Sequence, residues 1–324
     1  MTALPGYRLK QVMADGREAT ILSAVRLADG IEVVCKLLKE TASPAAVATL
    51  QREYSMLSRI GHPGIAQPVE WTTVAGRPMI VFLDIQGTSL DRRDPAQAMN
   101  PGAFLDLAIA AVDALAAVHA AGIVHKHLAP EHIVWNETAG LINLIDFGIA
   151  SELDAEKPEP SPLVAIEGNP LYLAPEQTGR MNRSVDYRAD FYSLGASFYW
   201  SLTGRPPFDG HDHLDLVHSH LAKAPPPPQS FNAAVPDVLA RLIAWMMAKD
   251  PEDRCQSCFG LKADLQRCRE AWRSAGRIDD FDIASHDRRP VLRIPQRVYG
   301  REGELRSEER RVGKECRSRW SPYH

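Results

Sequence analysis

The first third of the chain consists of short runs rich in β-branched and apolar residues. An Asp-Gly dipeptide separates two such runs, residues 20–25 and 31–38, and favours a tight hairpin turn between two strands. A third run, residues 79–85, is almost entirely apolar and also predicts a strand. Between these runs, residues 44–60 carry apolar side chains at helical spacing, which predicts one helix within a strand-rich region.

After Gly87 the hydrophobic pattern becomes helical. Residues 104–121 carry an apolar stripe, and residues 191–202 are apolar nearly all round, which predicts a helix buried on every side. Further elements are predicted at residues 123–125 and 141–145 (short buried strands) and at residues 238–249 and 260–272 (helices). The chain is therefore expected to form a small strand-rich part and a larger helical part, with a crevice between them.

Composition narrows the classes of protein to which the chain can belong. Of 324 residues, 45% are hydrophobic and 24% are charged, as in globular proteins with a sizeable core. The net charge of -4 predicts no nucleic-acid partner. No apolar run approaches about 18 residues, so we expect no membrane span. Five cysteines without a framework spacing, and a start unlike a signal peptide, predict a cytoplasmic location.

Three charged residues beside apolar runs could carry chemistry. Lys36 closes the second predicted strand, and Glu53 lies in the helix that follows it. Asp146 comes directly after residues 141–145 and is followed by Phe147 and Gly148. A cation with two acids could serve phosphoryl transfer, because that reaction depends on positioning and charge neutralisation.

Three more charged residues follow in a consistent order. Glu176 stands in an Ala-Pro-Glu motif, Asp190 opens the apolar helix, and Arg254 ends a Lys-Asp-Pro-Glu-Asp-Arg run. The order and spacing of all six resemble protein kinases, most closely the bacterial serine/threonine type. The resemblance implies an α+β, two-lobed protein kinase fold. Residues 7–84 would form a β-rich N-lobe with one main helix, and residues 85–275 a mainly helical C-lobe.

The resemblance also implies ligands and roles. ATP and Mg²⁺ would be the cofactors, and a protein would be the substrate. Lys36, paired with Glu53, would hold the nucleotide phosphates, and Asp146 would bind a metal ion. The nucleotide would contact five further residues: Gly16, Ile21, Val34, Leu83 and Val134. Structural roles are implied for His125, Phe147, Glu176, Asp190 and Arg254.

The predicted catalytic loop departs from the family pattern. His127 and His132 stand where kinases have the Asp base and an Asn metal ligand, Ala129 stands where many have Lys, and Asn169 replaces the usual Thr. A neutral imidazole can accept a proton but supplies no negative charge. Mg²⁺ prefers oxygen ligands, so His132 is a poor replacement. We therefore expect an ATP-binding pseudokinase or weak kinase, with weak or single-site Mg²⁺ binding.

Three other interpretations of the loop stay open. The chain could be an active serine/threonine kinase that transfers the γ-phosphate of ATP to protein. It could instead be a docking scaffold that binds no nucleotide. Finally, His127 and His132, with Asp146 brought near them as the family resemblance implies, could hold a transition-metal ion, because imidazole nitrogens suit such ions.

The C-terminal half carries a closer resemblance. Three segments, residues 176–183, 186–190 and 260–265, resemble a bacterial family of very large signalling proteins. In that family a kinase domain precedes a P-loop ATPase module and sensor domains, often with a histidine kinase. Residues 294–302 resemble the entry to the ATPase module. Residues 276–305 are therefore expected to be a linker, and the chain an N-terminal fragment whose partners include those downstream modules.

Residues 306–324 resemble a translated sequencing adapter. The segment is polar, with six basic and three acidic residues and few side chains to bury. We therefore expect it to be an artefact of sequence assembly without fold or function. A gene that lacks these codons would bear this out.

Overall fold

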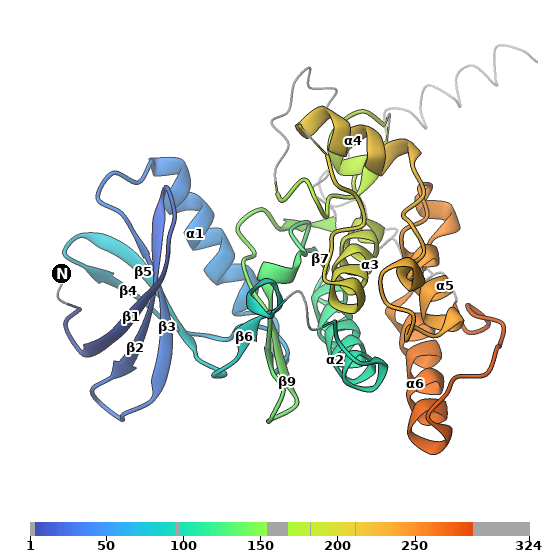
Figure 1. Cartoon of the computed structure of the whole chain (residues 1–324). Helices are drawn as coiled ribbons and strands as arrows, with labels where there is room; N and C mark the ends of the chain where they lie inside the picture. Colours follow the sequence, from blue (N-terminus) through green and yellow to red (C-terminus); the bar gives the residue numbers. More distant parts are fainter. Residues whose placement is uncertain (1–3, 95–97, 154–167, 182, 211, 288–324) are drawn as a thin grey trace, which may run out of the picture. The chain divides into compact units, whose positions relative to one another are not determined.

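The N-terminal part of the protein is a five-stranded antiparallel sheet with the strand order β1-β2-β3-β5-β4 (Figure 1). This computed structural model describes residues 4–94, 98–153, 168–181, 183–210 and 212–287. The strands are β1 (Tyr7–Asp15), β2 (Ala19–Arg26), β3 (Glu32–Leu38), β4 (Pro68–Val74) and β5 (Arg77–Leu83). Helix α1 (Pro44–Leu57) packs against β4 and β5.

Alternation along β3 gives the sheet two different faces. Val33, Cys35 and Leu37 are buried in a small apolar cluster with side chains of neighbouring strands. Val34 and Lys36 alternate with them and are only half-buried. Because successive side chains of a strand point to opposite faces, Val34 and Lys36 share the face away from that cluster. This is the face on which the candidate site is built.

Helix α1 begins where the sequence predicts and ends three residues early. The Ser43 hydroxyl accepts a hydrogen bond from the backbone N–H of Ala46, which caps the first turn. Beyond Leu57, the N–H groups of Arg59 and Ile60 donate to carbonyls three residues earlier rather than four, so the α-helix tightens and stops. Ile60 is nevertheless buried, and this prolongs the apolar stripe past the helix.

The C-terminal part is mainly helical. Its helices are α2 (Pro101–Ala120), α3 (Arg188–Thr203), α4 (His213–Ala222), α5 (Asp237–Met246) and α6 (Cys258–Ala275). Its short strands are β6 (Thr88–Ser89), β7 (Ile123–Val124), β8 (Ile133–Asn136), β9 (Leu141–Leu144) and β10 (Ser151–Glu152). β6, β8 and β9 form one small sheet, while β7 pairs with β10. Helix α3 is buried almost all round, as its sequence predicts.

Helix α2 bears on the expectation that the chain has no membrane span. It is 20 residues long, and its most apolar window meets the length and composition of a membrane span. More than half of that window, 56%, is buried inside the protein, where α2 packs against α6. The core helix of a folded protein meets the same two criteria, so length and composition alone decide nothing about a membrane here.

The larger apolar core runs from α1 into the helical part. It joins Leu50 and Leu57 of α1 to Phe104 of α2 and Phe191 of α3. A sheet-rich N-terminal part followed by a helical C-terminal part is the α+β, two-lobed kinase arrangement that the sequence predicts. Of the expected linker, residues 276–287 are described. Its remainder and residues 306–324 lie outside the described residues.

Candidate functional site

Lys36 lies at the centre of a charge network that joins the two parts of the protein. Its Nζ is 2.7 Å from Glu53 Oε2 on α1 and 2.9 Å from Asp146 Oδ1, which follows β9. Burial disfavours the Lys36 ammonium, but the two carboxylates outweigh it and raise the pKa of Lys36. Burial raises the pKa of Glu53, opposed by Lys36. The network therefore holds one cation between two acids.

Two of the predicted nucleotide contacts share a sheet face with Lys36. Val34 is two residues away on β3, and Ile21 on β2 lies directly opposite Lys36 in the strand register. Both side chains are half-buried. Leu83 differs, because it pairs with Val33 and is therefore on the other face, with 40% of the residue exposed. Its side chain is not brought to the Lys36 face.

The other two predicted contacts lie on separate elements. Val134 is half-buried on β8, where it pairs with Asn143 of β9. Gly16 is exposed in the turn between β1 and β2, and its N–H donates to the Ala19 carbonyl at 2.9 Å. The turn is thus closed by its own backbone hydrogen bond.

Asp190, which is fully buried, fixes the backbone of the loop that carries the histidines. It accepts hydrogen bonds from the backbone N–H groups of His125 and Lys126, at 2.9 and 2.8 Å. Lys126 has a left-handed φ of 62°, a conformation that non-glycine residues adopt rarely and at a cost. His119 on α2 also contacts Asp190, at 2.9 Å through Nε2. His119 lies within residues 104–121, for which the sequence predicts an apolar stripe but no role for this side chain.

His125 is a buried, neutral support for the same loop. Its Nε2–H donates to the Ile145 carbonyl at 3.1 Å, and its Nδ1 accepts the N–H of His127 at 3.2 Å. Its ring centre is 4.4 Å from that of Phe147, which is also fully buried. Burial lowers the pKa of His125 to about 4, in keeping with a neutral ring.

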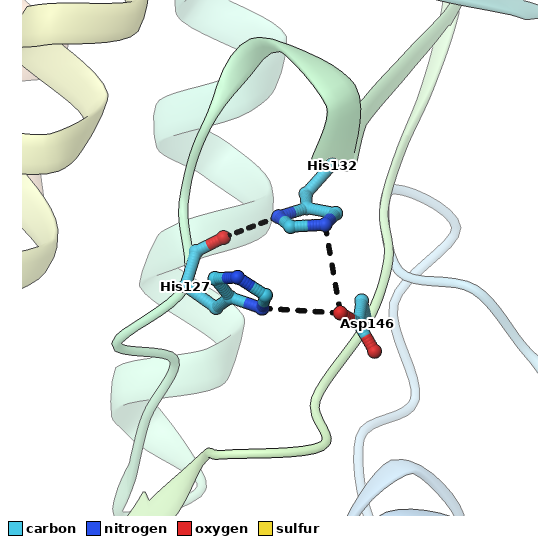
Figure 2. Close-up of side chains that lie close together, drawn as sticks. All are labelled: His127, His132 and Asp146. Carbon is cyan, nitrogen blue, oxygen red and sulfur yellow. Dashed lines mark hydrogen bonds and ion pairs between the residues drawn. The ribbon is translucent and has the colours of Figure 1, made fainter. Parts of the chain in front are cut away.

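His127 and His132 converge on a single oxygen of Asp146 (Figure 2). His127 Nδ1 is 3.0 Å from Asp146 Oδ2, and His132 Nε2 is 3.5 Å from it. The two ring centres are 4.1 Å apart. Asp146 has a left-handed φ of 62°, which turns its carboxylate towards Lys36 on one side and the histidines on the other. The Asp146 carboxylate thus contacts nitrogen atoms of three side chains, those of Lys36, His127 and His132.

Charges at this cluster shift the pKa of each partner. Burial raises the pKa of Asp146, but the contacts with His127 and Lys36 outweigh burial and hold it well below the usual range. Burial, followed by repulsion from His127, lowers the pKa of His132. Asp146 is therefore ionised at neutral pH.

The donor set fits poorly with the Mg²⁺ that the resemblance implies. Mg²⁺ prefers oxygen ligands in a near-octahedral arrangement. The site offers the Asp146 carboxylate, whereas His127 and His132 offer imidazole nitrogens. Asp146 could contribute to one ion, but the second position lacks an oxygen ligand from His132.

A second ion pair braces the helical part away from this cluster. Arg254 and Glu176 are fully buried and form two charge-assisted hydrogen bonds, at 2.6 and 2.7 Å.

Asn169, which stands where the resemblance expects Thr, donates to Glu131 Oε1 at 2.7 Å. The preceding residue, Gly168, packs against the His127 ring, where an added Cβ would come within 3.2 Å of a ring carbon.

Comparisons with known proteins agree with this fold. The model of the protein kinase domain family matches residues 7–264. The DNA damage-responsive serine/threonine-protein kinase RqkA of Deinococcus radiodurans is 33% identical over 261 residues, which cover 79% of this chain and 38% of RqkA. Serine/threonine-protein kinase Pkn1 of Myxococcus xanthus is 32% identical over 265 residues, which cover 80% of this chain and 38% of Pkn1.

A third relative belongs to the same group. Serine/threonine-protein kinase PkaA of Streptomyces coelicolor is 36% identical over 256 residues, which cover 76% of this chain and 44% of PkaA. The chain thus spans less than half the length of these curated relatives. The family model, the relatives and the α+β fold lead to one conclusion: this chain belongs to the protein kinase domain family, and it is a domain of the bacterial serine/threonine type.

Proposed function

We propose that this chain is an ATP-binding kinase domain with degraded phosphotransfer, a pseudokinase or a weak kinase. The observation that carries the proposal is the replacement of the base and metal positions by His127 and His132, both turned towards Asp146. ATP binding and phosphotransfer depend on different residues, so one can persist while the other is lost.

ATP binding is supported by the network around Lys36. The 2.7 Å contact with Glu53 positions the ammonium on the sheet face that also carries Ile21 and Val34. A half-buried cation held by an acid suits a phosphate group, and half-buried apolar side chains suit an adenine ring. The fit is better for the nucleotide than for its metal ions, so we propose weak or single-site Mg²⁺ binding at Asp146.

Slow phosphotransfer is supported by the chemistry of the base position. An aspartate there orients the acceptor hydroxyl, removes its proton and keeps a negative charge beside it. His127 as a neutral imidazole can accept a proton, but it supplies no charge, and its Nδ1 already faces Asp146 at 3.0 Å. Loss of a general base typically lowers a rate about 10²–10⁴-fold.

An active serine/threonine kinase is the second candidate. One observation favours it: Lys36, Glu53 and Asp146 form the complete network expected of an assembled kinase. In that case His127 would serve as the base, with a protein hydroxyl as the acceptor. The two candidates differ in rate rather than in ligand, so a rate measurement separates them.

We also propose that the chain is the N-terminal fragment of a larger cytoplasmic signalling protein. Residues 276–305 would link the kinase lobes, residues 7–84 and 85–275, to a P-loop ATPase module and sensor domains. The support is the resemblance of residues 294–302 to the entry of such a module. Sequencing the gene past residue 305 tests this, and the same reading shows whether residues 306–324 are adapter.

The activity is tested by restoring the family residues. The full chain and the His127→Asp/His132→Asn variant are compared for transfer of labelled γ-phosphate to a generic protein acceptor. We expect the variant to be at least about 10²-fold faster. Adding Lys36→Met to the variant should abolish the gain, which ties it to this site. A wild-type rate equal to that of the variant would favour the active kinase.

A further inference from the structure

We propose that His127, His132 and Asp146 form a binding site for one divalent transition-metal ion of the zinc type. The inference concerns the same loop as the proposed function but does not depend on ATP. It follows from where three donor atoms lie, which contacts hold them there, and what charge surrounds them.

The three donor atoms lie close together. His127 Nδ1, His132 Nε2 and Asp146 Oδ2 all lie within 4.8 Å of one another. The two nitrogens are 3.0 and 3.5 Å from the shared oxygen. Metal–ligand bonds of about 2.0–2.2 Å at tetrahedral angles separate neighbouring ligands by about 3.3–3.5 Å. The two nitrogen–oxygen distances are therefore close to the spacing of neighbouring ligands of one ion, and the fourth position would be open to water or another oxygen.

A hydrogen bond to the backbone fixes the orientation of the His132 ring. Its Nδ1 lies 2.6 Å from the His127 carbonyl oxygen, which can only accept, so Nδ1 carries the proton. In the neutral ring the Nε2 lone pair then points at Asp146 (Figure 2). Metal-binding histidines are usually fixed in this way, by donating the second ring N–H to a carbonyl or carboxylate.

His127 contacts Asp146 without forming a hydrogen bond to it. His127 Nδ1 is buried and 3.0 Å from Asp146 Oδ2, yet the pair does not meet the angles of a hydrogen bond. Two nitrogen atoms thus approach one carboxylate oxygen, one along a lone pair and one out of line. An ion between the three atoms would accept the Nε2 lone pair of His132, a lone pair of Asp146 Oδ2 and, with the His127 proton on Nε2, the Nδ1 lone pair of His127.

Charge and donor type select the class of ion. Lys36 contacts Asp146 Oδ1 and Glu53, so two carboxylates face one ammonium and leave one net negative charge for a cation. The other carboxylate oxygen of Asp146, Oδ2, faces His127 and His132. Imidazole nitrogen suits Zn²⁺, Cu²⁺, Fe²⁺ and Ni²⁺, whereas Mg²⁺ and Ca²⁺ prefer oxygen donors. The same substitutions that weaken a magnesium site therefore favour a transition-metal ion.

The test is metal binding by the full chain, stripped of metal with a chelator and free of nucleotide. Zn²⁺ alone is titrated calorimetrically, and Co²⁺ alone is titrated by absorbance, because its visible bands report coordination geometry. We expect one ion per chain with a tetrahedral Co²⁺ spectrum. The variants His127→Ala and His132→Asn should each weaken Zn²⁺ binding at least about ten-fold. His218→Ala, on an exposed residue of α4, is the matched control and should bind as the wild type does.

Each outcome decides the proposal. No Zn²⁺ binding by the folded wild type, or equal binding by all variants, overturns it. A strong thiolate-to-cobalt band also overturns it, because it would assign the ion to cysteines such as Cys258. Circular dichroism confirms that each variant is folded, and His132→Asn keeps the residue type that kinases carry there. Because no ATP is present, failure here leaves the proposed ATP binding intact, and loss of ATP binding would leave the metal site intact.

Discussion

Replacing Glu176 by Gln should destabilise the protein strongly, although it changes a single atom. Arg254 is 1% exposed and Glu176 is 2% exposed. The guanidinium of Arg254 has five N–H donors. Their acceptors are the two Glu176 oxygens and the carbonyls of Ala248, Arg188 and Lys249. The variant keeps this cation buried but removes its counter-charge.

The expected loss in the free energy of unfolding follows from the burial of the Arg254–Glu176 pair. Leaving one charge of a buried pair without its partner typically costs about 3–5 kcal/mol, because the remaining ion has neither water nor a counter-ion. Exposed pairs of similar length are worth only about 0–1 kcal/mol. The Lys10–Glu32 pair provides the comparison, since its atoms are 2.8 Å apart but its side chains are 44% and 31% exposed.

The assay is equilibrium unfolding in urea. We expect Glu176→Gln to lower the free energy of unfolding by about 3–5 kcal/mol, and Lys10→Ala to lower it by less than about 1 kcal/mol. The slope of the transition should stay the same, so that the midpoint reports stability alone. A loss below about 1 kcal/mol for Glu176→Gln would refute the reasoning, because burial would then not distinguish the two pairs.

Two further predictions concern other buried polar groups. Burial lowers the pKa of His220 from 6.5 to about 4. Between these two pH values the unfolded chain binds a proton that the native chain does not bind. The free energy of unfolding therefore decreases as the pH is lowered. Between pH 7.5 and 5 the wild type should lose about 2 kcal/mol more than His220→Asn, and an equal loss in both would contradict this. Asp190→Asn should cost about 1.5–3 kcal/mol in urea unfolding, since a charged acceptor of three hydrogen bonds is lost; an unchanged midpoint would contradict it.

The parts of the fold that local patterns encode could be predicted from the sequence. β2, β3 and β5 lie within two residues of the predicted strands, because each is a short apolar run with its own boundary signal. The sequence pattern does not predict β1, β4 or α4. β1 is mostly exposed, with apolar residues such as Val12 facing solvent, so its alternation is weak. α4 carries three histidines and exposes its first three residues, so little periodicity marks it.

The sequence predicts which residues form the candidate site but not how their side chains are arranged. The sequence places His127 and His132 in one loop, but their convergence depends on the left-handed backbone of Lys126 and Asp146. Neither residue is a glycine, the residue type that signals such turns most clearly. Strand register likewise decides that Leu83 lies opposite Val33, away from the Lys36 face. A strand pattern fixes alternation, but only the pairing fixes which face meets the crevice.

The central claim, an ATP-binding kinase domain, is tested most directly by a thermal-shift titration of the full chain with ATP, with and without Mg²⁺. At about 100 times its Kd, a ligand adds about 2.7 kcal/mol of stability. We predict a saturable stabilisation by ATP that Lys36→Met abolishes, because Lys36 is the cation held by Glu53 and Asp146. No stabilisation at millimolar ATP, or the same stabilisation in Lys36→Met, would contradict the account and leave a domain that docks partners without nucleotide.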